Sequence, residues 1–138
     1  MGKGHGRPPD EAGGAAAGHL GGVVRVAWGD YMIEDLTPQQ VAERLRQSDP
    51  PLLVDVREDW ERAVAHVAGS VHIPMPQLPI RLDELPSNRP IALLCHHGGR
   101  SMQVARWLDA QGWPALVNVD GGIHAWSATI DQEIPQYT

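Results

Sequence analysis

The residues best suited to chemistry lie in one short stretch, ALLCHHGGRSMQVARWL (92–108), which contains the only cysteine of the chain, Cys95. An apolar run leads into this cysteine, and a loop poor in large side chains follows it: His96, His97, Gly98, Gly99 and Arg100. Consecutive glycines allow backbone N–H groups to converge on one point. A helix predicted to begin near Ser101 adds unpaired N–H donors and the positive end of its dipole. The stretch therefore predicts a cradle for an anion, with the sulfur of Cys95 as the nearest candidate.

The energies indicate which part of this cradle matters most. A free thiol has a pKa of about 8.5, so it is mostly protonated at neutral pH. A helix terminus stabilises a nearby charge by about 0.3–1 kcal/mol, whereas each hydrogen bond to a charged group contributes about 1.5–3 kcal/mol. Two or three loop amides would therefore suffice to activate Cys95. The planar guanidinium of Arg100 would orient an anionic substrate.

These residues also have interpretations in which Cys95 is not a nucleophile. Cys95 could be an inert core residue, although its place at the end of an apolar run and before glycines favours a functional role. A metal site made of Cys95, His96 and His97 is disfavoured because three consecutive loop residues rarely converge on one ion. The two histidines are instead expected at the mouth of the pocket. Gly121 and Gly122 follow a predicted strand, where they allow close backbone approach beside the loop.

The helices and strands that would position this loop can be predicted from capping residues and from short apolar runs. Thr37, Pro38 and Gln40 form a capping-box signature at a helix start. Short apolar runs indicate strands that are buried on both faces, so the sheet is expected to be mainly parallel and covered by helices on both sides. Ligands of such sheets bind beyond the carboxyl ends of the strands, where Cys95 lies. Strands are predicted at 51–58, 70–74, 90–95 and 115–122, and helices at 37–47, 59–67, 78–86, 100–112 and 123–129.

The composition limits the class of protein. A chain of 138 residues is long enough for one domain with a sizeable core. Its formal net charge of −6 argues against nucleic acid or an anionic membrane surface as the main partner. A single cysteine cannot form an internal disulfide, and no apolar run approaches the roughly 18 residues that span a membrane, so we expect a cytoplasmic protein. Residues 1–24, rich in glycine, alanine and proline, are expected to be a disordered tail.

Three motifs together resemble one family. The loop CHHGGRS (95–101) resembles the active-site loop of rhodanese-like sulfurtransferases, in which a cysteine opens a loop whose amides hold a persulfide. The stretches LLVDVREDWERAVAHVAGSVHIP (52–74) and NVDGGIHAW (118–126) are similar to the first and the C-terminal signatures of that family. The resemblance covers residues 26 to about 130. It implies an α/β fold with a five-stranded, mainly parallel sheet flanked by helices on both faces, formed by a single rhodanese-like domain over 25–138.

The resemblance also implies an activity. Cys95 would be the catalytic nucleophile that takes a sulfane sulfur from a small anionic donor such as thiosulfate. The resulting persulfide would pass that sulfur to cyanide or to a thiol, either a small molecule or a thioredoxin-like protein, without a metal or organic cofactor. Asp55 would support the site, and for Arg57 a structural pair with Asp55 is favoured over direct substrate contact. The substrate-binding residues would be His96, His97, Gly98, Gly99, Arg100, Ser101 and Arg57.

Two alternatives remain open at this stage. Related phosphatases and arsenate reductases have a loop one residue longer than the six residues from Cys95 to Arg100, so the shorter loop favours sulfur transfer. The second alternative is a regulatory module that binds a partner and has little turnover, which the intact loop disfavours. Glu61 stands where larger sulfurtransferases carry a basic residue, and this leaves the donor open.

Overall fold

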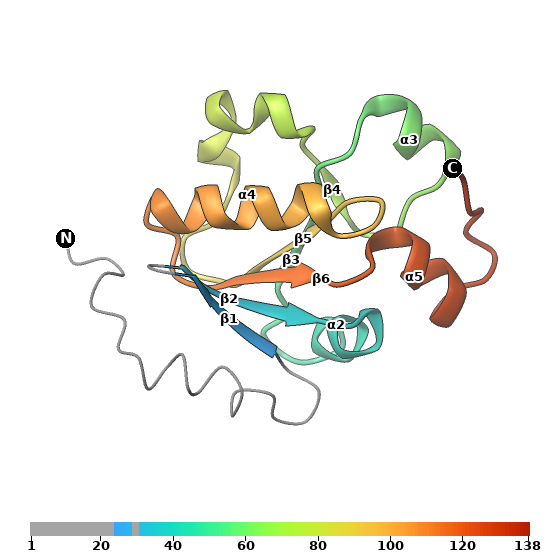
Figure 1. The fold of residues 1–138 in the computed structure, drawn as a ribbon, viewed down its shortest axis with the longest axis horizontal. Helices are drawn as coiled ribbons and strands as arrows, with labels where there is room; N and C mark the ends of the chain where they lie inside the picture. Colours follow the sequence, from blue (N-terminus) through green and yellow to red (C-terminus); the bar gives the residue numbers. More distant parts are fainter. Residues whose placement is uncertain (1–23, 29–30) are drawn as a thin grey trace.

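The computed structural model describes residues 24–28 and 31–138, with side chains from Ile33 onward. The predicted disordered tail, residues 1–24, lies outside the described residues apart from Val24, and it stays a prediction. The described chain forms one twisted sheet with helices on both of its faces (Figure 1). This is the α/β arrangement that the alternation of strands and helices predicts.

The sheet has six strands within the described residues, in the order β1-β2-β6-β5-β3-β4. The strands from β2 onward run parallel, which confirms the predicted five-stranded parallel sheet. The additional strand, β1, pairs antiparallel with β2, because only two residues separate them and so short a connection permits only an antiparallel pair. The bounds are β1 Val24–Trp28, β2 Tyr31–Leu36, β3 Leu52–Asp55, β4 Val71–His72, β5 Ile91–Leu94 and β6 Leu116–Val119.

The helices follow the predicted order. The first begins with the predicted capping box, in which the N–H of Gln40 donates to the Thr37 hydroxyl at 3.2 Å and the Gln40 side chain accepts the N–H of Thr37 at 2.9 Å. The helix predicted over 78–86 is instead two short 3-10 helices, because prolines there lack the N–H groups that an α-helix needs. The helices are α2 Pro38–Leu45, α3 Asp59–Val64, η1 Met75–Ile80, η2 Leu82–Glu84, α4 Gly99–Ala110 and α5 Gly122–Thr129.

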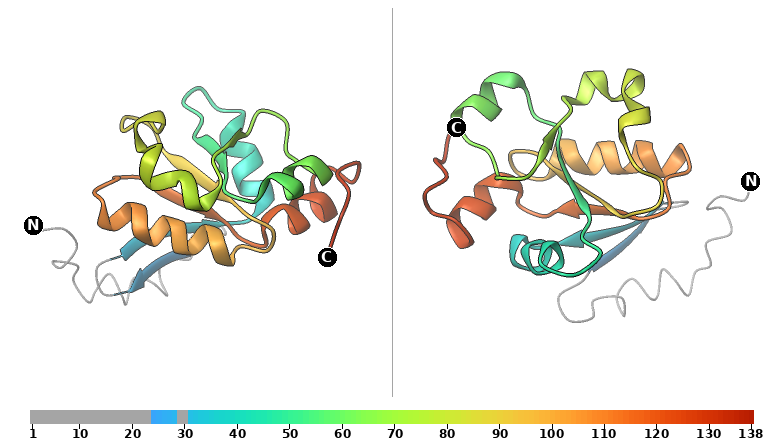
Figure 2. Two further views of the ribbon diagram at one scale, coloured as in Figure 1. Left: turned by 90° about the horizontal axis from the view of Figure 1, so that it is seen from above. Right: turned by 180° about the vertical axis from the view of Figure 1, so that it is seen from behind.

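Alternation along the central strand β5 divides the core into two layers. Ile91, Leu93 and Cys95 face one side of the sheet, where they belong to the cluster that includes residues of α4 and η1. Ala92 and Leu94 face the other side, together with residues of α2 and α5. Figures 1 and 2 show α4 and α2 on opposite sides of the sheet. Successive side chains of a strand point to opposite faces, so the position of Cys95 along β5 directs its sulfur toward α4.

Candidate active site

Cys95 follows the last residue of β5, within the parallel part of the sheet. Its side chain is 1% exposed and packs in the same cluster as Val104 and Ala105 of α4. The thiol is free. The strand thus delivers one reduced sulfur to the carboxyl edge of the sheet, which is where a parallel sheet binds its ligands.

The loop between β5 and α4 directs two backbone N–H groups at this sulfur. The N–H of Gly98 donates to Cys95 Sγ at 3.0 Å, and the N–H of Ser101 donates to it at 3.3 Å. Gly98 has a φ of +108°, and a Cβ there would lie 3.2 Å from the backbone nitrogen of Gly121. The conformation therefore favours glycine at this position, and a Cβ would also require a small shift of Gly121. The two donors, at the N-terminal end of α4, favour a negative charge on the sulfur.

The start of α5 holds the loop from its other side. The N–H of Ile123 donates to the carbonyl oxygen of Cys95 at 2.8 Å, and the N–H of His124 donates to that of His96 at 3.1 Å. Gly122 lies so close that a Cβ on it would overlap both carbonyl oxygens. The close backbone approach expected for the Gly121–Gly122 pair is therefore found at Gly122.

Side-chain hydrogen bonds lead from the sulfur to a carboxylate. The hydroxyl of Ser101 lies 3.2 Å from Cys95 Sγ and donates to Asn118 Oδ1. Asn118 Nδ2 donates in turn to Asp35 Oδ1 at 2.9 Å. Burial raises the pKa of Asp35, against the lowering effect of the Asn118 hydrogen bond. Because the Ser101 hydroxyl has one proton, it can donate to a thiolate only by releasing Asn118.

Arg100 forms a two-pronged ion pair with Glu61 of α3. Its Nη1 and Nη2 lie 2.7 Å from Oε1 and Oε2 of that carboxylate. Glu61 is 2% exposed and also accepts the backbone N–H of Glu58 and the hydroxyl proton of Tyr137. Burial by itself would raise the pKa of Glu61, but the hydrogen bonds, led by that from Arg100, lower it to about 2. The positive charge of Arg100 is therefore matched by a carboxylate beside the loop.

Arg57 and Asp55 form an ion pair in which both residues are fully buried. Nε and Nη2 of Arg57 donate to the two carboxylate oxygens of Asp55 at 2.9 and 2.7 Å. The remaining donors reach the carbonyl oxygens of Glu61 and Ala65 and the hydroxyl of Tyr137. All five N–H groups of this guanidinium thus have acceptors. This geometry supports the structural pair that the sequence favours for Arg57 over direct substrate contact.

The C-terminal segment adds Tyr137 to this network. Its hydroxyl accepts from Arg57 Nη1 and donates to Glu61 Oε2, both at 2.8 Å. Burial raises the pKa of Tyr137 to about 12, with the Arg57 hydrogen bond opposing that rise. Its ring stacks on the ring of His96, with centroids 4.0 Å apart and planes 8° from parallel. One side chain therefore joins the end of the chain to α3, to the Arg57 pair and to the active-site loop.

Two histidines of the loop meet a third from α5. The rings of His96 and His97 lie with centroids 3.9 Å apart, and His97 and His124 are 5.0 Å apart. Burial lowers the pKa of His96, and His97 lowers it further. Nε2 of His96 is buried and makes no hydrogen bond within the described residues. The side chains of His97 and His124 are exposed.

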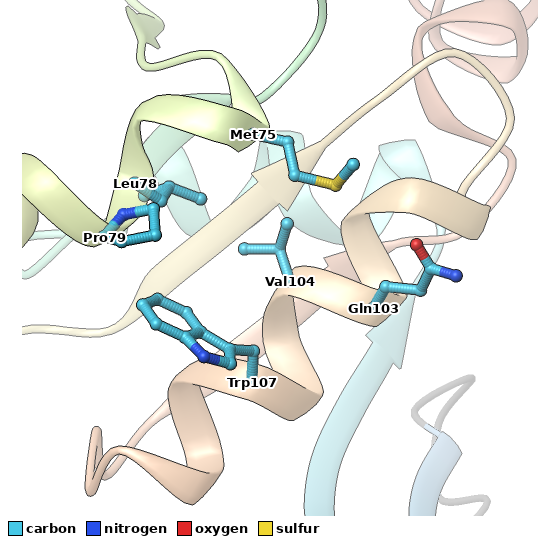
Figure 3. Close-up of a pocket in the computed structure, with 6 residues that line it drawn as sticks. All are labelled: Met75, Leu78, Pro79, Gln103, Val104 and Trp107. Atoms are coloured by element: carbon cyan, nitrogen blue, oxygen red, sulfur yellow. The ribbon is translucent and has the colours of Figure 1, made fainter.

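Two pockets in this part of the structure differ in polarity. One of about 540 Å³ is bordered by Arg100 and carries the carboxylates of Glu58 and Asp59 on its rim. Another of about 230 Å³ lies between η1 and α4, and Figure 3 shows the side chains around it. The first has charged side chains among its lining residues. The second is mostly apolar and is lined by Met75, Leu78, Pro79, Gln103, Val104 and Trp107.

Comparisons with known proteins agree with this geometry. The family model of the rhodanese-like domain matches residues 37–129. The chain belongs to the rhodanese-like domain family. Within this family, a sulfurtransferase of Allochromatium vinosum is 33% identical over 96 residues, which cover 70% of this chain and 90% of that protein. The thiosulfate sulfurtransferase GlpE of Ectopseudomonas mendocina is 33% identical over 101 residues, which cover 73% of this chain and 91% of that protein.

A solved structure of the same family has a similar fold. A rhodanese-like domain protein from Staphylococcus aureus has a TM-score of 0.65 and 33% sequence identity, covering 75% of this chain and 98% of that chain. These relatives support a sulfurtransferase role for this rhodanese-like chain. No helix in the described part of the chain has the length and apolar character needed to cross a membrane.

Sequence reasoning finds the rhodanese-like loop but misses several partners of its residues. Of the predicted stretch, the structure brings Gly98 and Ser101 to the sulfur, whereas Arg100 pairs with Glu61 and His96 and His97 lie beside His124. Asp55 and Arg57 form a buried pair of their own. Nothing in the sequence indicates that Tyr137 reaches this site. Glu61 was noticeable in the sequence because it stands where larger sulfurtransferases are expected to carry a basic residue. Its pairing with Arg100, however, is evident only from the fold.

Proposed function

We propose that this protein transfers a sulfane sulfur through a persulfide on Cys95. The thiolate attacks the outer sulfur of a donor such as thiosulfate, forming an S–S bond while the donor's own S–S bond breaks and sulfite leaves with the bonding electrons. An acceptor, either cyanide or the thiolate of a small molecule or thioredoxin-like protein, then attacks the outer sulfur of the persulfide. This second step returns Cys95 to its thiolate form.

One observation carries the proposal. The N–H groups of Gly98 and Ser101 converge on the sulfur of Cys95, at 3.0 and 3.3 Å. Donors that are fixed before reaction favour the anionic sulfur in the attacking thiolate and again in the departing thiolate. The six residues from Cys95 to Arg100 also form the shorter loop expected for sulfur transfer, which argues against a phosphatase or arsenate reductase.

The charges around Arg100 bear on which sulfur donor the site accepts. The guanidinium of Arg100 is paired with Glu61, and the adjoining hollow carries two further carboxylates, Glu58 and Asp59. A dianion such as thiosulfate therefore meets little uncompensated positive charge at this hollow. Donors of lower charge, such as organic persulfides, belong in the same test. A cytoplasmic location stays a prediction.

The test is mass spectrometry of the intact protein. Incubation with thiosulfate or an organic persulfide is expected to add one sulfur atom, about 32 Da, because the cradle supports the bound persulfide. A thiol reductant or cyanide should remove the added mass, and Cys95→Ser should not acquire it. If the wild-type protein gains no sulfur from either class of donor, the relay is rejected in favour of a binding module.

A further inference from the structure

The three histidines beside the active-site loop have the arrangement of metal ligands. His96, His97 and His124 each offer a ring nitrogen, and these nitrogens all lie within 4.8 Å of one another. A tetrahedral zinc ion with Zn–N bonds of about 2.0–2.1 Å needs ligand nitrogens about 3.4 Å apart. The side chains of His97 and His124 are exposed, so their rings can turn to close this difference. Nε2 of His96 is buried and makes no hydrogen bond within the described residues, a state that ligation would relieve.

The backbone beneath the cluster is fixed, which lowers the cost of assembling a site. The N–H of His124 donates to the carbonyl oxygen of His96, so the two residues that come from different elements are joined directly. Gly122 packs against the same carbonyl with no room for a Cβ. The ring of Tyr137 stacks on the ring of His96, with centroids 4.0 Å apart. Only side-chain rotations are therefore needed to bring the three nitrogens onto one ion.

We propose that His96, His97 and His124 bind one divalent transition-metal ion of the class that imidazole ligands suit, such as Zn²⁺. Three protein ligands leave one coordination position open to water or to a soft anionic ligand such as a thiolate. The site goes beyond the proposed sulfur transfer, which needs no metal. It also differs from the Cys95, His96 and His97 set that the sequence disfavours. The structure supplies the third ligand from α5, while Cys95 is 1% exposed and its sulfur is already engaged by Gly98 and Ser101.

The test is calorimetric titration of the reduced, full-length protein with Zn²⁺. We expect one ion to bind per chain. His124→Ala should weaken binding by more than about tenfold, because loss of a mere outer-shell partner already costs that much. His97→Ala should act in the same direction. Both side chains are exposed, so the variants should retain the melting temperature of the metal-free wild-type protein.

Three controls separate this site from other zinc ligands of the chain. His66→Ala changes an exposed histidine outside the cluster, and the double variant His5→Ala/His19→Ala removes those near the N-terminus. Both should bind Zn²⁺ as the wild type does. Cys95→Ala should also retain binding, and Co²⁺ bound to the wild type should show no thiolate charge-transfer absorption. Undiminished binding by His124→Ala, loss of binding in Cys95→Ala, or no binding by the wild type would each overturn the proposal.

Discussion

Gly122 determines how closely α5 approaches the residue that carries the thiol. It has a φ of +62°, and a Cβ would overlap the carbonyl oxygens of Cys95 and His96. Gly122→Ala should therefore lower the free energy of unfolding by more than the about 1–3 kcal/mol that a left-handed backbone costs alanine. It should also slow persulfide formation, because the loop has to move. Urea unfolding and the rate of sulfur loading measure the two effects.

Gly69 provides the matched control for this substitution. It has a φ of +85°, but no atom lies within 4 Å of the position that its Cβ would take. Gly69→Ala should therefore show the backbone cost alone, with sulfur loading unchanged. Equal losses of stability in the two variants would contradict the close approach that we assign to Gly122.

The residues of the loop were predictable because their chemistry is contiguous in the sequence. A thiol, two glycines and a helix start follow one another, and the local backbone is enough to bring N–H groups to Cys95. The partners of the charged groups were not predictable in the same way. Glu61 and Arg100 are separated by 39 positions, and their contact depends on how α3 packs beside α4. Local patterns carry no information on that packing.

At the scale of elements, the Glu61–Arg100 pair links α3 to α4 and makes stability depend on pH. The pKa of Glu61 is about 2 in the folded protein, against 4.5 for the group without these interactions. Its ionised form therefore stabilises the fold fully above about pH 4.5, and this contribution is lost as the pH falls through about 2. We expect the wild type to exceed Glu61→Gln by about 3 kcal/mol at neutral pH. Urea unfolding between pH 7 and pH 2 should show this gap closing.

The control for this prediction is a second pair in which an arginine contacts both oxygens of a glutamate, Arg81–Glu84. Arg81 contacts both carboxylate oxygens of Glu84, at 2.8 and 2.9 Å, but the side chain of Glu84 is 46% exposed, against 3% for that of Glu61. Glu84→Gln should change the free energy of unfolding by less than about 1 kcal/mol. A Glu61→Gln variant with the stability and pH dependence of Glu84→Gln would show that the buried pair does not hold the helices together.

The sheet was predictable where its strands are buried on both faces. The runs around β3, β5 and β6 are apolar and are bounded by prolines, glycines or charged residues, so their sequence pattern predicts buried strands. The strands β2 and β1 were not predictable from the sequence as separate strands. β2 carries acidic residues between apolar ones, and β1 enters the sheet only by pairing along its edge with β2. Such edge pairing depends on a neighbour and leaves a weak local signal.

At the scale of the whole molecule, Tyr137 joins the C-terminal end of the chain to the site. Its hydroxyl bonds to Arg57 and Glu61, and its ring stacks on His96. Tyr137→Phe should remove the hydroxyl contacts and retain the stacking. We expect a loss of about 2–3 kcal/mol in the free energy of unfolding, since hydrogen bonds to charged groups contribute about 1.5–3 kcal/mol. Tyr137→Ala should lose more, because the stacked ring is also removed, and a fully stable Phe variant would contradict this role.

The strand order also has a consequence for the protein during its synthesis. β6 lies between β2 and β5, although Leu116 follows Leu36 by 80 positions, so the sheet cannot close until most of the chain exists. Gly122, whose helix buttresses the loop, follows Cys95 by 27 positions. A nascent chain that has not reached α5 therefore carries a thiol without its buttressed cradle. The sulfur loading that we propose for Cys95 would therefore reach its full rate only after α5 has been made and has docked against the loop.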